Sequence, residues 1–254
     1  RPEPDAEPCV SLSVSLAVYF IKFAFVLTSF TTDRIAMRHP TSNRDPRGLH
    51  ERAISTVMML LEEQQSSIPT IERIAGLLGE SEDRMRTLYP QDRDLLIVGV
   101  EGALVVLIDT CTKAVVQVDP RDPIAQFVAL GHAYLDWADR YPMPFRLLQD
   151  STPLDTMSIP TLRRYMESLH DLMLRMLKRA QEEGRLHPAD NIETLTLSAR
   201  CFVSGAARMV VDGRLRQWAP GADPLTMAKD LTADFVRRMA RSSQPQGRHK
   251  PVAV

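Results

Sequence analysis

Residues 70–93 carry the side chains of this chain that are best suited to recognise another molecule. An arginine fork can bind O6 and N7 of guanine with two hydrogen bonds, so Arg84 and its neighbour Thr87 could read the edges of bases. The hydroxyl groups of Thr70 and Ser81 could bind phosphates together with the backbone amides at the starts of their helices. These residue types point to a nucleic-acid ligand.

Four more arginines lie near this segment. Arg86 and Arg93 would add positive charge beside a phosphate, and Arg44 and Arg47 precede the first helix, where an arm could reach a phosphate or the minor groove. For each of them the alternative is a solvated surface arginine. Residues 38–96 contain eight arginines, no lysine and ten acidic residues, so bulk charge does not by itself indicate DNA.

The chain carries none of the common catalytic motifs. HExxH, GxSxG, GxxxxGK[ST] and a GxGxxG after a strand are all missing, and the histidines are scattered singly. Cys9, Cys111 and Cys201 are far apart and form no CxxC pair, so neither a disulfide framework nor a zinc site is expected. We expect no catalysis, no metal and no cofactor.

The elements that must position these residues are helices. Apolar residues recur at helical spacing and β-type alternation is rare, which predicts an all-α fold for the 254 residues. About nine helices are expected, over residues 48–61, 70–78, 82–88, 92–116, 124–139, 145–148, 161–183, 188–211 and 225–241. The second and third are short and are joined by a turn at Gly79, which is the spacing of a helix-turn-helix. Spacing alone leaves a plain helical bundle open.

The segment 48–106 resembles the DNA-binding signature of the tetracycline-repressor (TetR) family without a gap. The resemblance rests on TIERIA at 70–75, Gly79 with Ser81, LYP at 88–90 and DLL at 94–96. It implies a three-helix DNA-binding domain followed by a helical bundle that binds a ligand and dimerises. A weaker likeness to one family subgroup extends over residues 131–147, where an aromatic-rich helix ends in Tyr141-Pro142.

The chain departs from the family pattern at the recognition helix. Glu82 and Asp83 stand where small or basic residues are usual, Arg86 replaces an aromatic residue, and Asp92 replaces a lysine. Acidic residues at a helix start suit the helix dipole, so Glu82 and Asp83 have a structural interpretation, although they could also accept hydrogen bonds from cytosine. The departures put DNA affinity in doubt rather than the fold.

The resemblance further implies an effector pocket among the fourth to eighth helices. Its candidate residues are aromatic residues, methionines and one histidine: Tyr134, Trp137, Phe145, Met166, His170, Met173, Phe202 and Met209. His170 and Arg200 lie in apolar surroundings and could orient a ligand. Since methionines and aromatic residues at helical spacing are common in any core, plain packing is the alternative for each residue.

The last two helices would form the interface of a homodimer, as in the family. Small residues at 204–207 permit close approach of two helices, and apolar area comes from four side chains: Val203, Val210, Leu231 and Phe235. Two-fold symmetry would place the two recognition helices about one DNA turn, roughly 34–36 Å, apart on a palindrome.

The predicted domains are an N-terminal extension at 1–43, a DNA-binding domain at 44–96, a regulatory domain at 97–241 and a disordered tail at 242–254. Residues 10–30 of the extension are nearly all apolar. Three interpretations stay open: a start assigned too far upstream of Met37, a membrane tether, or an extra docked helix. We expect a cytoplasmic protein on the nucleoid.

The function expected from the resemblance is a regulator, most often a repressor, that leaves a palindromic operator when a small effector binds. The alternative is a helical ligand- or protein-binding module whose helix-turn-helix no longer binds DNA. The acidic recognition helix supports that alternative.

Overall fold

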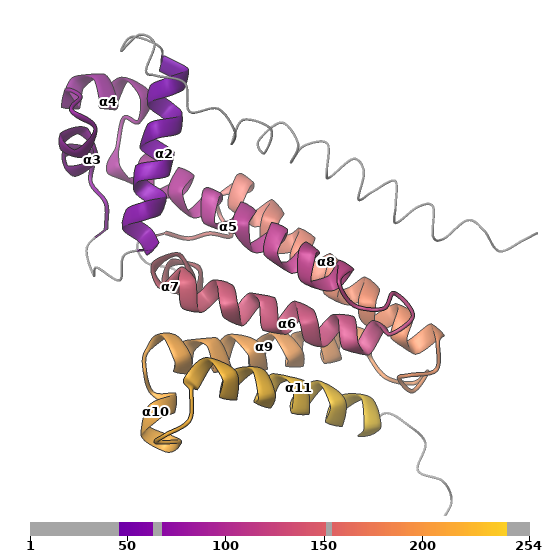
Figure 1. The fold of residues 1–254 in the computed structure, drawn as a ribbon. Coiled ribbons are helices and arrows are strands. Elements are labelled where there is room, and N and C mark those ends of the chain that lie inside the picture. Colours follow the sequence, from indigo (N-terminus) through magenta and orange to yellow (C-terminus); the bar gives the residue numbers. More distant parts are fainter. Residues whose placement is uncertain (1–45, 63–67, 151–153, 243–254) are drawn as a thin grey trace, which may run out of the picture. The chain divides into compact units, whose positions relative to one another are not determined.

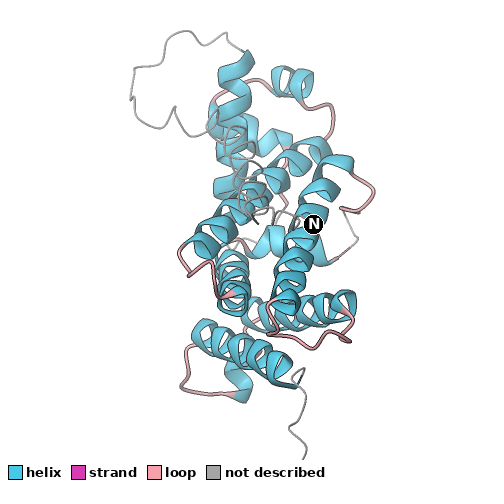
Figure 2. Cartoon of the chain, turned by 90° about the vertical axis from the view of Figure 1, so that its right-hand side faces the viewer, coloured by secondary structure: helices cyan, strands magenta, loops and turns pink. Residues whose placement is uncertain are grey.

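The computed structural model describes residues 46–62, 68–150 and 154–242, and every element within these ranges is a helix (Figure 1). Between the helices these ranges hold only loops and turns (Figure 2). The all-α prediction is therefore confirmed. The predicted extension at 1–43, with its apolar stretch, lies outside the described residues, as does Arg44.

Three helices form the helix-turn-helix region: α2 (Pro46–Glu62), α3 (Ile71–Leu78) and α4 (Glu82–Leu88). Thr70 caps the start of α3 and Ser81 caps the start of α4, each by accepting a hydrogen bond from a backbone N–H three residues on. Gly79 ends α3 in the left-handed conformation, at φ 65°, which glycine adopts without steric cost. The local sequence thus sets the turn between the two short helices.

The α2 and α3 helices bury one apolar stripe each, and α4 adds Met85 to the same core. Val57 of α2 packs against α5 at Gly99. A Cβ on Gly99 would collide with Val57 Cγ1, so glycine at this position permits the approach of the two helices. The helix-turn-helix region is docked on α5 at this point.

The longest helix is α5 (Asp92–Val116), which packs against α2, α6, α7 and α8. Ten of its residues are buried, mostly as adjacent pairs that recur every four positions, and many apolar residues between these pairs are half-buried, which explains its nearly continuous apolar sequence. By length and composition α5 could also cross a membrane, but half of its most apolar window is buried inside the protein. We interpret it as the central helix of the bundle.

The remaining helices surround α6 (Pro123–Arg140). They are α7 (Pro142–Gln149), α8 (Pro160–Glu182), α9 (Ile192–Val211), α10 (Leu215–Trp218) and α11 (Pro224–Ser242). α6 contacts all of them except α10 closely, and α9 and α11 lie side by side (Figure 1). A Cβ on Gly131 would lie 2.9 Å from Thr232 Cγ2, so this glycine lets α6 approach α11.

The described helices match the nine predicted ones and add α10. This extra helix is a single turn of four residues, too short to give a periodic pattern. α7 begins at Pro142 rather than near Phe145, because proline at the first helical position loses no hydrogen bond. The predicted boundary between residues 96 and 97 falls inside α5 and stays a prediction.

Candidate nucleic-acid interface and ligand cavity

The hydroxyl groups predicted to bind phosphate are exposed at the starts of α3 and α4. Thr70 Oγ1 accepts from the backbone N–H of Arg73, and Ser81 Oγ accepts from that of Arg84, each at 3.3 Å. Each hydroxyl hydrogen can still donate to a phosphate oxygen. Thr87 donates its hydroxyl to the carbonyl of Asp83 at 2.9 Å and is also exposed.

Arg84 is held by an acidic residue that precedes the recognition helix. Its Nη1 donates to Glu80 Oε2 at 2.6 Å, while Arg52 of α2 donates to Oε1 of the same carboxylate, also at 2.6 Å. The Glu80 side chain is only 5% exposed. The hydrogen bond from Arg52 and the charges of both arginines hold the pKa of Glu80 below its ordinary value. This ion-pair group ties α4 to α2.

Arg86 is paired within the recognition helix itself. Its Nε donates to Glu82 Oε1 at 2.9 Å, four residues earlier, and this bond is the main reason why the pKa of Arg86 is raised. Arg93, by contrast, is exposed and has no ion pair in the part of the chain that the structure describes. Arg47 lies in the first turn of α2. The predicted contact residues on α3, α4 and the start of α5 thus come together, but two of their arginines already have carboxylate partners.

Asp92, which departs from the family pattern, has a structural role. Its Oδ1 accepts a hydrogen bond from the backbone N–H of Ile71 at 2.9 Å. The carboxylate therefore caps α3 from the start of α5, across 21 positions of the sequence. No local sequence pattern joins the two residues, so this contact is not predictable from their spacing.

A second contact fixes the far end of α4. The hydroxyl of Tyr89 shares a hydrogen bond of 2.7 Å with Nδ1 of His50, and the two rings stack with centroids 5.7 Å apart. Burial raises the pKa of Tyr89 to about 12, so its hydroxyl stays protonated at neutral pH. Both ends of α4 are therefore tied to the helices beside it.

The bundle encloses a cavity of about 160 Å³. Its walls come from six helices, α5 to α9 and α11. The lining residues are Cys111, Phe127, Leu130, Gly131, Tyr134, Leu148, Gln149, Met166, Leu169, Met173, Ala199, Arg200, Val203, Ser204, Thr232, Phe235 and Val236. Most are apolar, and Arg200 is the one residue of this described lining with a formal charge.

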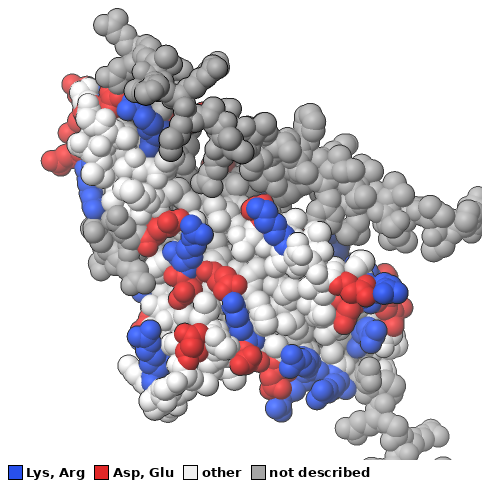
Figure 3. All heavy atoms as spheres, in the orientation of Figure 1, with Lys and Arg blue, Asp and Glu red and all other residues white. Residues whose placement is uncertain are grey.

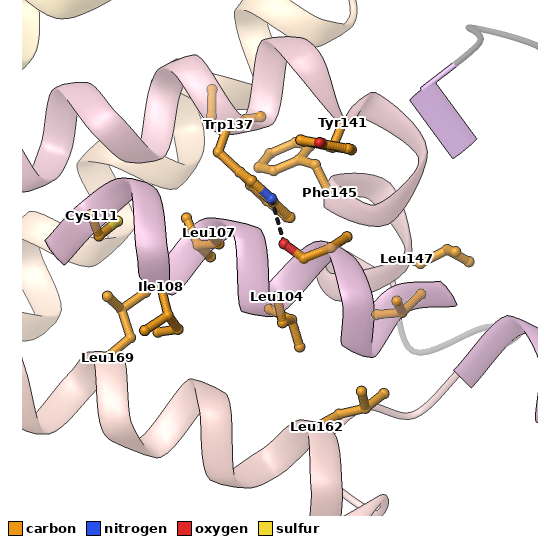
Figure 4. Close-up of a cluster of buried hydrophobic side chains, with 14 of the residues drawn as sticks. Leu104, Leu107, Ile108, Cys111, Trp137, Tyr141, Phe145, Leu147, Leu162 and Leu169 are labelled. Carbon is orange, nitrogen blue, oxygen red and sulfur yellow. Dashed lines mark hydrogen bonds between the residues drawn. The ribbon is translucent and has the colours of Figure 1, made fainter. Parts of the chain in front are cut away.

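Three of the eight predicted ligand residues, Tyr134, Met166 and Met173, line this cavity. Trp137 instead points to α5, where its Nε1 donates to the carbonyl of Ala103 at 2.8 Å (Figure 4). Phe145 is fully buried in the same cluster and meets the Tyr134 ring edge-on, at 6.3 Å between centroids. These two aromatic residues support the cavity wall from behind.

The other predicted ligand residues lie elsewhere in the bundle. Phe202 stacks on Phe235 with ring centroids 4.3 Å apart, and Phe235 in turn lines the cavity. Met209 packs against the core, and the buried Nδ1 of His170 has no hydrogen-bond partner among the described residues. Roles for these residues in ligand binding stay predictions.

Polar groups of the cavity gather around Tyr134. Gln149 Nε2 donates to its hydroxyl at 3.4 Å, and Ser204 shares a hydrogen bond with it. Burial raises the pKa of Tyr134, and the bond with Ser204 and the charge of Arg200 oppose that rise. This side of the cavity can therefore hydrogen-bond a polar ligand group.

Known proteins share this architecture. Residues 127–235 match the family described as "Tetracyclin repressor-like, C-terminal domain". No curated protein matches the chain. A protein of unknown function from Rhodococcus sp. RHA1 is similar over 82% of this chain and all of its own, with 20% identity and a TM-score of 0.65.

Two solved regulators are also similar in structure. The fatty acid degradation regulator FadR from Bacillus halodurans matches with a TM-score of 0.58 and 10% identity, over 74% of this chain and 97% of its own. A tetR-family transcriptional regulator from Streptomyces coelicolor matches with a TM-score of 0.54 and 15% identity, over 79% and 91%. At these identities the likeness shows the fold.

Proposed function

Because residues 127–235 match the C-terminal domain of tetracycline-repressor-like proteins, we propose that this chain is a cytoplasmic transcription regulator of the TetR family that binds a palindromic operator as a dimer and is released by a small molecule. Repression is the direction we infer, because a protein that leaves its operator on binding an effector would block transcription until then. The assignment rests on the arrangement of the two candidate sites within one bundle.

The observation that carries the proposal is the continuity of α5. Leu95 and Leu96, near its start, are buried in the core next to the helix-turn-helix, and Cys111, near its end, lines the cavity. The 16 positions from Leu95 to Cys111 span about 24 Å at 1.5 Å per residue. A ligand that displaces α5 in the cavity would move the platform on which α2 sits, and α2 is joined to α4 through the ion pairs of Glu80.

On DNA, we assign roles to the contact residues by chemistry. Thr70 and Ser81 would bind phosphates together with the backbone amides at the helix starts. Arg84 and Thr87 would read base edges. Phosphate charge would be neutralised by the flanking arginines Arg44, Arg47, Arg86 and Arg93. Arg84 and Arg86 must exchange their carboxylate partners for DNA. The Arg86–Glu82 pair is exposed, and such pairs are worth only about 0–1 kcal/mol. When Arg84 leaves the nearly buried carboxylate of Glu80, that carboxylate stays paired with Arg52, so both exchanges are feasible.

The dimer would form through α9 and α11. Leu197 of α9 and Leu231 of α11 are 53% and 44% exposed, which leaves apolar area for a partner. Gly205 is exposed, and a Cβ there would meet nothing within 4 Å, so a helix of a second copy could approach α9 closely. Light scattering should give a dimer mass for the full chain and a monomer mass after Leu197→Asp with Leu231→Asp. An unchanged mass would reject this interface.

The competing function, a ligand- or protein-binding module without DNA affinity, is favoured by the ion pairs of Glu80 and Glu82. Acidic and basic side chains are interspersed on the face that Figure 3 shows, without an extended basic surface there. A protein that had lost its operator would keep the fold, the cavity and such internal pairs. The two functions differ in one measurable property, affinity for DNA.

A mobility-shift titration of the full chain on its own upstream DNA, repeated at several salt concentrations, tests the proposal. We expect selective binding that weakens steeply with salt and is lost in Arg84→Ala with Thr87→Ala. Arg163→Ala, which removes an exposed arginine of α8, is the matched control. Binding no tighter than to random DNA, over several promoters, would instead establish the module.

A further inference from the structure

The described lining of the cavity is mostly apolar. It includes side chains such as Phe127, Leu130 and Met173, while Arg200 supplies the single formal charge among the described lining residues. No acidic residue is among the described residues that line the cavity. A ligand that fills it therefore meets an apolar wall and one cation.

Arg200 is half-buried and has no acidic partner within the described residues, whereas other half-buried arginines of the bundle have one. Arg208 pairs with Asp212 on the same helix, and Arg179 pairs with Glu183. A half-buried guanidinium without a carboxylate is unfavourable beside apolar groups, unless an anion comes to it. The charge balance of the cavity is completed by a ligand with one negative charge.

Hydrogen-bond donors accompany the cation. Ser204 lies four residues after Arg200, one turn along α9, and both residues line the cavity. The Tyr134 hydroxyl lies between Ser204 and Gln149. A planar carboxylate can accept two parallel hydrogen bonds from the Arg200 fork and a further one from a hydroxyl. A phosphate monoester carries about two charges and would leave one of them uncompensated here.

The volume limits the apolar part of the ligand. An apolar protein cavity of about 150 Å³ accommodates benzene, and this cavity has about 160 Å³. We propose that the cavity binds a small organic monocarboxylate whose apolar body is about one aromatic ring in size, with Arg200 as the receptor of its carboxylate. This names the chemical class of the effector in the proposed function and rests on the cavity being the effector site.

The test measures binding to the full chain by calorimetry in the absence of DNA, with phenylacetate as the probe and neutral phenylacetamide as its comparison. We expect phenylacetate to bind at least about ten-fold more tightly, because charge-assisted hydrogen bonds are the stronger ones. Acetate, which lacks the ring, should bind far more weakly. Equal affinities for phenylacetate and phenylacetamide, or no binding of phenylacetate, would overturn the proposal.

Substitutions of Arg200 test its role in binding the carboxylate directly. Arg200→Gln should abolish the preference for phenylacetate, and Arg200→Lys should keep part of it, since the charge remains but the fork is lost. Arg175→Gln, on the exposed side of α8, should bind like the parent chain. Thermal unfolding checks that each variant is folded, and an unchanged preference in folded Arg200→Gln would refute the assignment. If phenylacetate binds through Arg200 while DNA binding is unaffected, the ligand class stands and the proposed regulation fails.

Discussion

Arg84 and Arg86 of the recognition helix are paired with carboxylates of their own chain, whereas Arg200 in the cavity has no acidic partner among the described residues. In the first region a ligand has to compete with Glu80 and Glu82. In the second region an anion has nothing to displace. DNA affinity in this protein is therefore set against an internal competitor, while anion affinity in the cavity is not.

The largest effect is expected from a substitution of Met85, which should affect the DNA-binding region but not the cavity. Within α4, all of whose residues are described, only Met85 is fully buried, so Met85→Ala should lower the free energy of unfolding by about 2–5 kcal/mol. Because α4 loses its anchor, DNA binding should be lost while phenylacetate still binds. Urea unfolding and calorimetry measure both.

Leu77→Ala, on a 55% exposed side chain of α3, is the control for Met85→Ala and should change stability by no more than about 0.5 kcal/mol. A simultaneous loss of phenylacetate binding in Met85→Ala would show that the two regions do not behave separately.

A smaller effect is expected where the regions join, at Gly99. Gly99→Ala forces a Cβ into Val57 and should destabilise the protein by about 1–3 kcal/mol despite the better helix propensity of alanine. Gly76→Ala, where a Cβ meets nothing within 4 Å, should instead stabilise it by about 0.5–1 kcal/mol. The denaturant midpoints of the Gly99→Ala and Gly76→Ala variants measure both changes in stability. Equal shifts of the two midpoints would reject the close α2–α5 contact.

Removing the internal competitor should strengthen DNA binding. Glu80→Gln frees both Arg52 and Arg84, and we expect affinity to rise about ten-fold at low salt, with a steeper salt dependence. Glu72→Gln removes one exposed charge of α3 without freeing an arginine of the Glu80 group. If the DNA affinity of the two variants rises equally in a mobility-shift titration, net charge rather than the ion pairs controls affinity.

The carboxylate of Glu80 also makes the stability of the protein depend on pH in the acid range. Its pKa is lower in the folded state than in the unfolded chain, where it is about 4.3. Its contribution to stability is therefore present above about pH 4.3 and is lost as the pH falls through the folded value. Glu80→Gln should flatten the pH dependence of thermal unfolding on that acid side, and an unchanged profile would count against the ion pairs.

The smallest effect concerns the polar side of the cavity. Tyr134→Phe removes the hydroxyl that contacts Gln149 and Ser204, and we expect phenylacetate affinity to fall by about three-fold. Tyr165→Phe is the control: it removes a tyrosine hydroxyl outside the cavity lining and should leave phenylacetate binding unchanged. A gain in affinity would mean that the hydroxyl faces the ligand body rather than its carboxylate.

Local sequence patterns predicted the helices and their caps well. Thr70, Gly79 and Ser81 act on neighbours within a few residues, so their roles follow from spacing. The Arg86–Glu82 pair is likewise one turn apart. The Arg52–Glu80 and Ile71–Asp92 contacts join residues 28 and 21 positions apart, and no local rule predicts them.

The resemblance implied that aromatic residues of α6 line a ligand pocket, but it did not distinguish which of them do so. Tyr134 and Trp137 are one turn apart on the same helix, yet the first lines the cavity and the second is bonded to α5. Helix rotation by a few tens of degrees decides between the two outcomes, and the sequence does not set that rotation. Phe235 was predicted for the dimer interface and lines the cavity for the same reason.

The unbroken course of α5 has a thermodynamic consequence for the proposed regulation. If one helix transmits the effect of an effector to the operator-binding end, the coupling free energy is shared by both ligands. An effector that weakens operator affinity 100-fold would then itself bind 100-fold more weakly to the operator-bound protein. Affinities measured on the free protein would overestimate how readily the effector clears an occupied promoter.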